Sequence, residues 1–273
     1  MEFENGNKLK GYLYNESKRL NIHSNYAYTY YFIRKFLERL YRDNQDVFNV
    51  KGSISQLSHT VKLTRAITDV DISSNLDILD SSYLIEKEAS KNEDEIKFKI
   101  KDKFTTKNNT INFKILCNFD HIEHLIKIDL KKEESNDMIK KSLPIIMKKD
   151  IAFDISTYPI EKHIATKMYI LLRNADRNLS VSKETRRLKD FYDLHFLLQT
   201  DYNDELVCKY FDQICNERCD VNINNIDMSL LSDNFVQNNI GLYLQDKKRY
   251  GFSDIPFENL VEEAKDEISK KLR

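Results

Sequence analysis

A Gly-Ser pair near the start of the chain has the composition of a phosphate-binding turn. Gly52 and Ser53 follow a short apolar run at residues 48–50. Glycine lets the backbone approach a ligand closely. The apolar spacing after Ser53 predicts a short helix with Ser53 as its N-cap, and the free N–H groups of its first turn would face an anion.

Two aspartates follow on a predicted strand at residues 66–72. Asp69 and Asp71 lie two positions apart, so their carboxylates would share one face of the strand, with Val70 and Ile72 directed to the core. Two such carboxylates repel each other unless a cation lies between them. Mg²⁺ suits this arrangement because it takes one or two carboxylates and keeps waters and phosphates as its other ligands.

Each motif also has an ordinary explanation. A Gly-Ser pair forms a simple turn in most proteins, and an Asp-x-Asp stretch can be a solvated strand edge. Their order and spacing, in a chain with only 5 glycines, favour nucleotide chemistry.

Composition sets the limits of the fold. The 273 residues are 41% hydrophobic and 32% charged, which predicts one large or two small folded domains. No apolar run approaches the roughly 20 residues of a membrane-spanning helix. The first residues are polar and acidic, so we expect no signal peptide and a cytoplasmic location. The net charge of −1 means that nucleic-acid binding would need a local basic patch.

The first half of the chain is expected to contain most of the strands. A helix at residues 26–43 would bury Ile33, Phe36 and Leu40 and expose Arg34 and Arg39. Alternating or apolar patterns predict strands at residues 46–50, 95–101, 110–119 and 124–130, with a turn at 108–109.

Lysines line the polar side of several of these predicted strands. On the strand at residues 124–130, Lys127 and Asp129 share the face opposite the apolar residues. Such rows of lysine could contact nucleic-acid backbone. We favour the alternative, a solvated sheet face or a guarded edge.

The second half is expected to be helical. Residues 133–150 read as a loop with a short element near 144–147, and the predicted helices span 160–174, 183–198, 204–217 and 257–272. The fold class is therefore α+β, with a mixed or antiparallel sheet and flanking helices followed by a C-terminal helical bundle. We place the two domains at residues 1–155 and 156–273.

Charged residues take unusual positions in two of these helices. Lys167 lies on or beside an apolar stripe, which indicates either a snorkelling lysine or a cleft where its charge meets an anion. Lys189, Asp190 and Asp193 form one polar stripe, which most often is a solvated face. His195 borders the apolar side and is expected to be a packed histidine.

The cysteines add little to the chemistry. Cys215 and Cys219 would stack on one helix face, with Cys208 upstream and Cys117 in a strand. A zinc site is one interpretation, but no histidine has the usual spacing. Buried, reduced thiols are the favoured interpretation.

Taken in order, four stretches of the chain resemble one known family. They are residues 48–53, 65–72, 164–168 and 187–194, the last of which contains a Lys-Asp-Phe-Tyr-Asp-Leu run. The chain is similar to the AbiEii/AbiGii-type nucleotidyltransferase toxins, which belong to the DNA polymerase β-like superfamily. The likeness runs from about residue 31 to 198, and the closing helix has the same character.

The resemblance implies a role for each matching residue. Gly52 and Ser53 would hold the outer phosphates of the nucleotide, with Lys167 and Lys189 as further nucleotide contacts. Mg²⁺ would be bound by a set of carboxylates consisting of Asp69, Asp71 and, from a neighbouring strand, Asp129. In the helical half, Asp190 would complete the catalytic site with support from Asp193.

The resemblance also implies a function. The enzyme would transfer a nucleotide from an NTP to RNA, with the 3′ end of tRNA as the acceptor, and so arrest translation and growth. A cognate antitoxin would be its partner, in a toxin–antitoxin or phage abortive-infection system. Two alternatives stay open at this point: an antibiotic-type nucleotidyltransferase that modifies a small molecule, and a nucleotide-binding protein without turnover.

Overall fold

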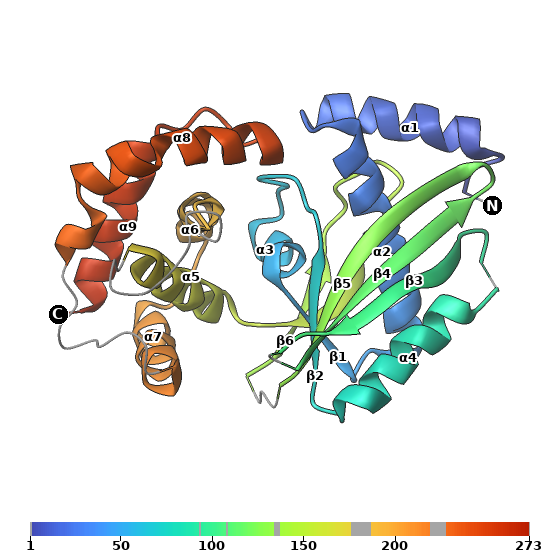
Figure 1. Ribbon diagram of the computed structural model, residues 1–273, viewed down its shortest axis with the longest axis horizontal. Coiled ribbons are helices and arrows are strands. Elements are labelled where there is room, and N and C mark those ends of the chain that lie inside the picture. Colours follow the sequence, from blue (N-terminus) through green and yellow to red (C-terminus); the bar gives the residue numbers. More distant parts are fainter. Residues whose placement is uncertain are drawn as a thin grey trace. The chain divides into compact units, whose positions relative to one another are not determined.

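The computed structural model describes residues 2–92, 94–107, 109–133, 137–175, 187–218 and 228–272. The chain divides into two compact units, Met1–Tyr158 and Pro159–Arg273. We call the first the sheet unit and the second the helical unit (Figure 1). That the helical unit completes a cleft on the sheet unit stays a prediction.

The sheet unit is built on one mixed sheet. Seven strands in the described part of the chain lie in the order β3-β4-β5-β2-β1-β7-β6. Strand β2 pairs antiparallel with β1 and parallel with β5, and β7 pairs parallel with β1. The strands are β1 (Phe48–Lys51), β2 (Val70–Ser74), β3 (Lys97–Thr105), β4 (Thr110–Phe119), β5 (Ile122–Lys132), β6 (Ile139–Leu143) and β7 (Phe153–Thr157).

The sheet unit also contains helices. They are α1 (Gly6–Arg19), α2 (Ser24–Asn44), α3 (Gly52–Thr60) and α4 (Ile78–Ser90). Helices α2 and α4 lie along the face of β3, β4 and β5 that carries buried side chains, and α1 packs on α2 (Figure 1). Strand β4 alternates strictly between buried and half-buried positions, so its apolar residues pack under the helices. The other face of the sheet, which we call the open face, carries the polar alternates.

The α+β class with a mixed sheet is confirmed, and several predicted elements move. The aspartate strand begins at Val70 and not at residue 66, so Asp69 precedes it. The N-cap of α3 is Lys51 and not Ser53, because Gly52 turns the chain directly from β1 into the helix. The predicted loop at 133–150 contains β6, and β7 follows it. Helices α1 and α4 were also not predicted.

The prediction that Arg34 and Arg39 lie on the exposed face of α2 is wrong. Their exposed fractions are 1% and 2%. Arg34 donates to the backbone carbonyl oxygens of Pro144 and Ile151, and Arg39 donates to the carbonyl oxygen of Ile96. Both guanidinium groups therefore bind loop backbone inside the unit, which periodicity along the helix alone does not reveal.

His124 gives the sheet unit a pH-dependent stability. Its ring stacks on Phe32 at a centroid distance of 5.7 Å, and Nε2 lies 2.9 Å from Oγ1 of Thr29. Burial lowers the pKa of His124 from 6.5 to about 4. Between these values the unfolded chain binds the proton and the folded chain does not, so stability falls as the pH drops.

We therefore expect the urea midpoint of the wild-type protein to fall as the pH is lowered from 6.5 towards about 4. In His124→Phe, which keeps an aromatic ring against Phe32, this dependence should be weaker. Circular dichroism during urea titration at several pH values measures both. Equal pH dependence in the two proteins would show that His124 is not the responsible group.

The helical unit is described by helices alone. They are α5 (Ile160–Ala175), α6 (Lys189–Leu198), α7 (Asp204–Arg218), the 3₁₀ helix Met228–Leu231, α8 (Asp233–Tyr250) and α9 (Phe257–Lys271). Aromatic rings fill its core, with Tyr192 stacked on Phe252 at 4.2 Å and Tyr243 on Phe257 at 4.6 Å. Helix α8 was not predicted. Two predictions fall outside the described residues. They are the part of the 183–198 helix that precedes residue 187, and the placement of Cys219.

Candidate active site

Gly52 lies directly against the carboxylate of Asp71. Its φ is +64°, a left-handed conformation that favours glycine. A Cβ atom at this position would lie 2.2 Å from Oδ2 of Asp71, a distance that atoms cannot adopt without moving. Both the backbone conformation and the space therefore require glycine here. The turn between β1 and α3 and the aspartate of β2 form one compact site.

Asp71 and Asp129 are direct neighbours across the sheet. They are paired in register on the parallel strands β2 and β5. Asp129 also lies opposite Asn112 on β4, and the Asn112 side-chain amide donates to Oδ1 of Asp129 at 2.7 Å. Because opposed residues on neighbouring strands project to the same side, the three polar side chains share the open face.

The carboxylates repel one another. The pKa of Asp129 is raised from 3.8 to about 6, first by burial and then by the negative charges of Asp71 and Asp69. Lys127 and the hydrogen bond from Asn112 oppose this rise. Although Asp69 lies just outside β2, its charge reaches the same cluster. Burial and like charge therefore both disfavour the ionised form of Asp129.

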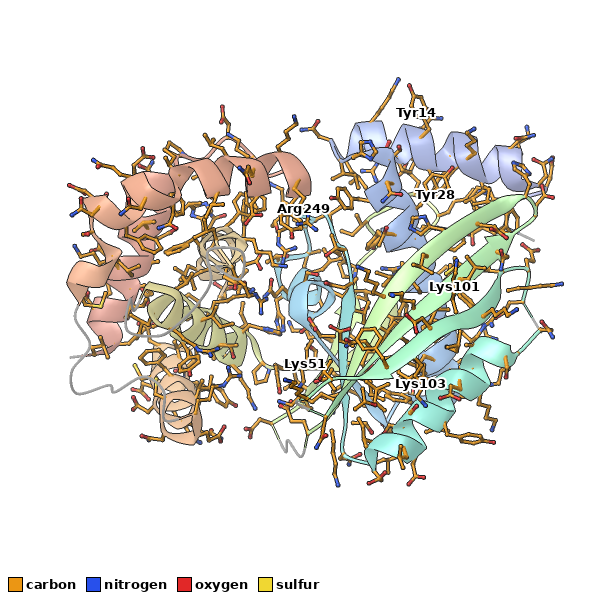
Figure 2. The ribbon with its side chains drawn as sticks, in the orientation of Figure 1. Tyr14, Tyr28, Lys51, Lys101, Lys103 and Arg249 are labelled. Carbon is orange, nitrogen blue, oxygen red and sulfur yellow. The ribbon has the colours of Figure 1, made fainter. Side chains whose placement is uncertain are left out.

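The first turn of α3 borders this cluster. The N-cap residue Lys51 makes no side-chain capping hydrogen bond, and Ser53 in the first turn is half-buried. N–H groups at such a helix start can bind an anion. Lys51, which is labelled in Figure 2, belongs to β1. It forms an ion pair with Glu133, and its Nζ lies 5.1 Å from the centre of the Tyr158 ring.

A second charged cluster lies inside the helical unit. Nζ of Lys167 on α5 contacts Oδ1 of Asp190 and lies 2.6 Å from Oδ2 of Asp193, both on α6. The exposed fractions of these three residues are 5%, 0% and 3%. Arg187 Nε lies 3.0 Å from the other carboxylate oxygen of Asp190. Lys167 and the two carboxylates thus form a buried network, and the half-exposed side chain of Arg187 borders it. The Nζ atom of Lys189 lies 5.2 Å from the centre of the Tyr250 ring.

The family model of the nucleotidyl transferase AbiEii toxin, type IV toxin–antitoxin system, matches residues 51–270. The chain belongs to the AbiEii family of nucleotidyltransferase toxins. It is therefore a nucleotidyltransferase. The match includes Gly52 and Asp71 of the sheet unit and the buried network around Lys167 in the helical unit. Family membership implies an NTP as the substrate and suggests an antitoxin as the partner.

Two solved structures from Helicobacter pylori are similar to this AbiEii-family chain. One is JHP933, with a TM-score of 0.48 and 14% identity over 87% of this chain and 89% of that chain. The other is provisionally described as a nucleotidyltransferase, with a TM-score of 0.46 and 16% identity over 87% of this chain and 92% of that chain. No curated protein matches the chain. Among the described residues of this family member, no helix is long and apolar enough to cross a membrane.

The predicted site residues of the AbiEii toxin fall into two groups. The structure brings Gly52, Asp71 and Asp129 together on the sheet unit. It brings Lys167, Asp190 and Asp193 together in the helical unit. The catalytic and nucleotide-binding roles of both groups stay predictions.

Sequence reasoning missed Asn112 as part of this AbiEii-family site. The signal was present, because Asn112 occupies a polar position in the alternation of β4. Placing it beside Asp129 needed the strand register, which only the structure provides.

The carboxylates of this AbiEii-family enzyme fit a magnesium ion. In the described part of the chain, no three His, Cys, Asp or Glu side chains are gathered into a metal-binding group. Mg²⁺ does not need such a group, since one or two carboxylates with waters and phosphates suffice. Asp71 and Asp129 supply hard oxygen ligands from neighbouring strands in register. After burial, the negative charges of Asp71 and Asp69 also raise the pKa of Asp129, and a cation would offset this repulsion. Whether Asp69 joins them stays a prediction.

We expect Gly52→Ala to reduce the rate of nucleotidyl transfer by the AbiEii toxin about 10²-fold. The added Cβ would lie 2.2 Å from Oδ2 of Asp71, so the carboxylate must move out of its position. The left-handed backbone adds roughly 1–2 kcal/mol of strain. Gly11→Ala in α1 is the matched control, since no atom lies within 4 Å of the added Cβ. Its helix should be stabilised by up to about 1 kcal/mol without loss of activity. Initial rates and thermal unfolding of both variants test this, and full activity in Gly52→Ala would refute it.

Proposed function

We propose that this enzyme transfers a nucleotide from an NTP to RNA in a Mg²⁺-dependent reaction, with the 3′ end of tRNA as the acceptor. Modified tRNA would block translation and growth, in a toxin–antitoxin or abortive-infection system in the cytoplasm. The cognate antitoxin would counter this effect. The observation that supports the proposal is the contact of the left-handed Gly52 with Asp71, which is itself in register with Asp129.

The reaction would be an in-line displacement at the α-phosphorus. The 3′ oxygen of the RNA forms a bond to the α-phosphorus as the bond to the bridging oxygen breaks, and pyrophosphate leaves with that electron pair. Asp71 and Asp129 would hold Mg²⁺, which when bound neutralises phosphate charge and lowers the pKa of a coordinated hydroxyl.

Residues of both units have proposed roles in this reaction. The first-turn N–H groups at Gly52 and Ser53 would bind the outer phosphates. Lys167 would neutralise the triphosphate, with Lys189 as a further nucleotide contact. Asp129 or Asp190 would accept the proton of the acceptor hydroxyl.

Labelled NTPs and total RNA provide the first test. Each α-labelled NTP is incubated with Mg²⁺, total RNA and either wild type, Asp71→Asn or Asp80→Asn. Asp80 is an exposed carboxylate in the first turn of α4, so its variant is the matched control. We expect label on tRNA with wild type and Asp80→Asn and none with Asp71→Asn. Label on a small molecule or on protein alone, or equal labelling by all three, would contradict the proposal.

A further inference from the structure

An exposed aromatic ring shares a sheet row with the carboxylates. Phe104 lies opposite Asn112, Asn112 opposite Asp129, and Asp129 opposite Asp71. These four residues therefore project from the open face of neighbouring strands β3, β4, β5 and β2. The exposed fraction of Phe104 is 46%. Strand β3, which carries Phe104, lies two strands, or about 10 Å, from β5.

Lysines surround this row on the same face. Lys127 and Lys131 flank Asp129 at two-residue spacing along β5, and both are exposed. Lys114 lies opposite Lys127 on β4 and forms an ion pair with Asp102 of β3, and its Nζ lies 5.7 Å from the centre of the Phe104 ring. A chain of phosphates crossing the strands would thus meet cations on both sides of the carboxylates.

Exposed Leu125 extends the surface. It projects from β5 two residues before Lys127, and its exposed fraction is 37%. A flat sheet face with an aromatic ring among lysines is the form of surface that stacks bases and holds the backbone of single-stranded nucleic acid. A guarded sheet edge would account for the lysines, but it does not require an exposed ring in the row of the carboxylates.

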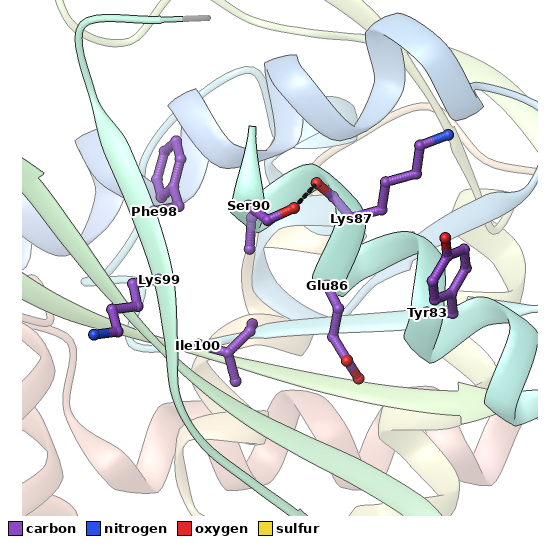
Figure 3. Close-up of a pocket in the computed structure, with 8 residues that line it drawn as sticks. Tyr83, Glu86, Lys87, Ser90, Phe98, Lys99 and Ile100 are labelled. Atoms are coloured by element: carbon purple, nitrogen blue, oxygen red, sulfur yellow. Dashed lines mark hydrogen bonds between the residues drawn. The ribbon is translucent and has the colours of Figure 1, made fainter. Parts of the chain in front are cut away.

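The groove of about 430 Å³ between α4 and β3 is a rival surface (Figure 3). Tyr83, Glu86 and Phe98 are among its lining residues. In Figure 3 the Lys99 side chain points away from α4. Phe98 is buried on the face that α4 covers, so the sheet separates this groove from Asp71 and Asp129. A chain bound in the groove would not present its end to the carboxylates.

We propose that the open face of β3, β4 and β5 binds the single-stranded 3′ segment of the RNA acceptor. One base stacks on Phe104, phosphates contact Lys127 and Lys131, and the terminal ribose lies towards Asp129 and Asp71. This assignment rests on the proposed transfer to RNA and names the surface that would select a single-stranded end.

Binding of a labelled oligoadenylate of roughly 10 nucleotides tests the surface without turnover. Phe104→Ala should weaken its binding about 10-fold or more. Lys127→Ser combined with Lys131→Ser should weaken it and flatten its salt dependence. Tyr83→Ala is the matched control, because Tyr83 is 65% exposed and lines the rival groove. It should bind like wild type, and the affinity of Mg-NTP should be equal in wild type, Phe104→Ala and Tyr83→Ala.

The outcomes separate this inference from the proposed function. If wild type labels RNA, and Phe104→Ala binds and labels RNA equally well, the assignment of RNA binding to the open face is wrong and the proposed transfer to RNA stands. If Tyr83→Ala weakens oligoadenylate binding as much as Phe104→Ala does, the assignment of binding to the open face is also wrong. If wild type labels no RNA, but Phe104→Ala and the double lysine variant lose oligoadenylate binding while Tyr83→Ala keeps it, the surface assignment stands and the proposed transfer fails. Unchanged oligoadenylate binding by the double lysine variant would also overturn the inference.

Discussion

Asp71→Asn should abolish nucleotidyl transfer, with a fall of about 10³-fold or more. The substitution keeps the size of the side chain and the contact with Gly52, so the turn between β1 and α3 should remain in place. It removes one of two adjacent negative charges that would hold Mg²⁺. Loss of several kcal/mol of transition-state stabilisation gives a rate change of this size.

Three measurements make the Asp71 result specific. Circular dichroism should show an unchanged fold, because Asp71 is exposed and lies at the polar side of β2. The Asp80→Asn control should retain full activity. Because one like charge is removed, the pKa of Asp129 should move down towards its ordinary value, which carbon-detected NMR can follow. Activity within about 10-fold of wild type would exclude Asp71 from the reaction.

Lys167→Met should destabilise the helical unit by about 3–5 kcal/mol. The substitution leaves the carboxylates of Asp190 and Asp193 buried without their shared cation, and uncompensated buried charge is costly. Arg187 can offset part of this loss, since its Nε is already 3.0 Å from Asp190. Urea unfolding followed by circular dichroism measures the change.

Control variants separate burial of charge from loss of a lysine. Lys209→Met on α7 removes an exposed lysine of the same unit and should change stability by no more than about 0.5 kcal/mol. Adding Asp190→Asn and Asp193→Asn to Lys167→Met should recover part of the lost stability, because no buried charge then lacks a partner. A Lys167→Met midpoint equal to that of Lys209→Met would contradict the buried network. Activity of Lys167→Met below its unfolding transition tests the proposed catalytic role.

The local pattern of apolar and polar residues was enough to predict much of the secondary structure of the sheet unit. Strand β4 lies at Thr110–Phe119, as its alternation predicts, and α2 follows its apolar stripe. The burial of Val70 and Ile72 matches the predicted inner side of the aspartate strand. These features depend on neighbours along the chain, so a linear pattern can specify them. Strand β6 and helix α8 have weak periodicity along the chain, so no linear pattern predicted them.

The sequence by itself predicted Gly52, Asp71, Asp129 and Lys167 as site residues, and it identified the family to which the chain belongs. Only the tertiary structure decided that Asp71 and Asp129 share a row and that Asp190 and Asp193 enclose Lys167. Strand register and helix packing join residues far apart in the chain. Their energies come from side chains that meet only after folding, so no local pattern records them.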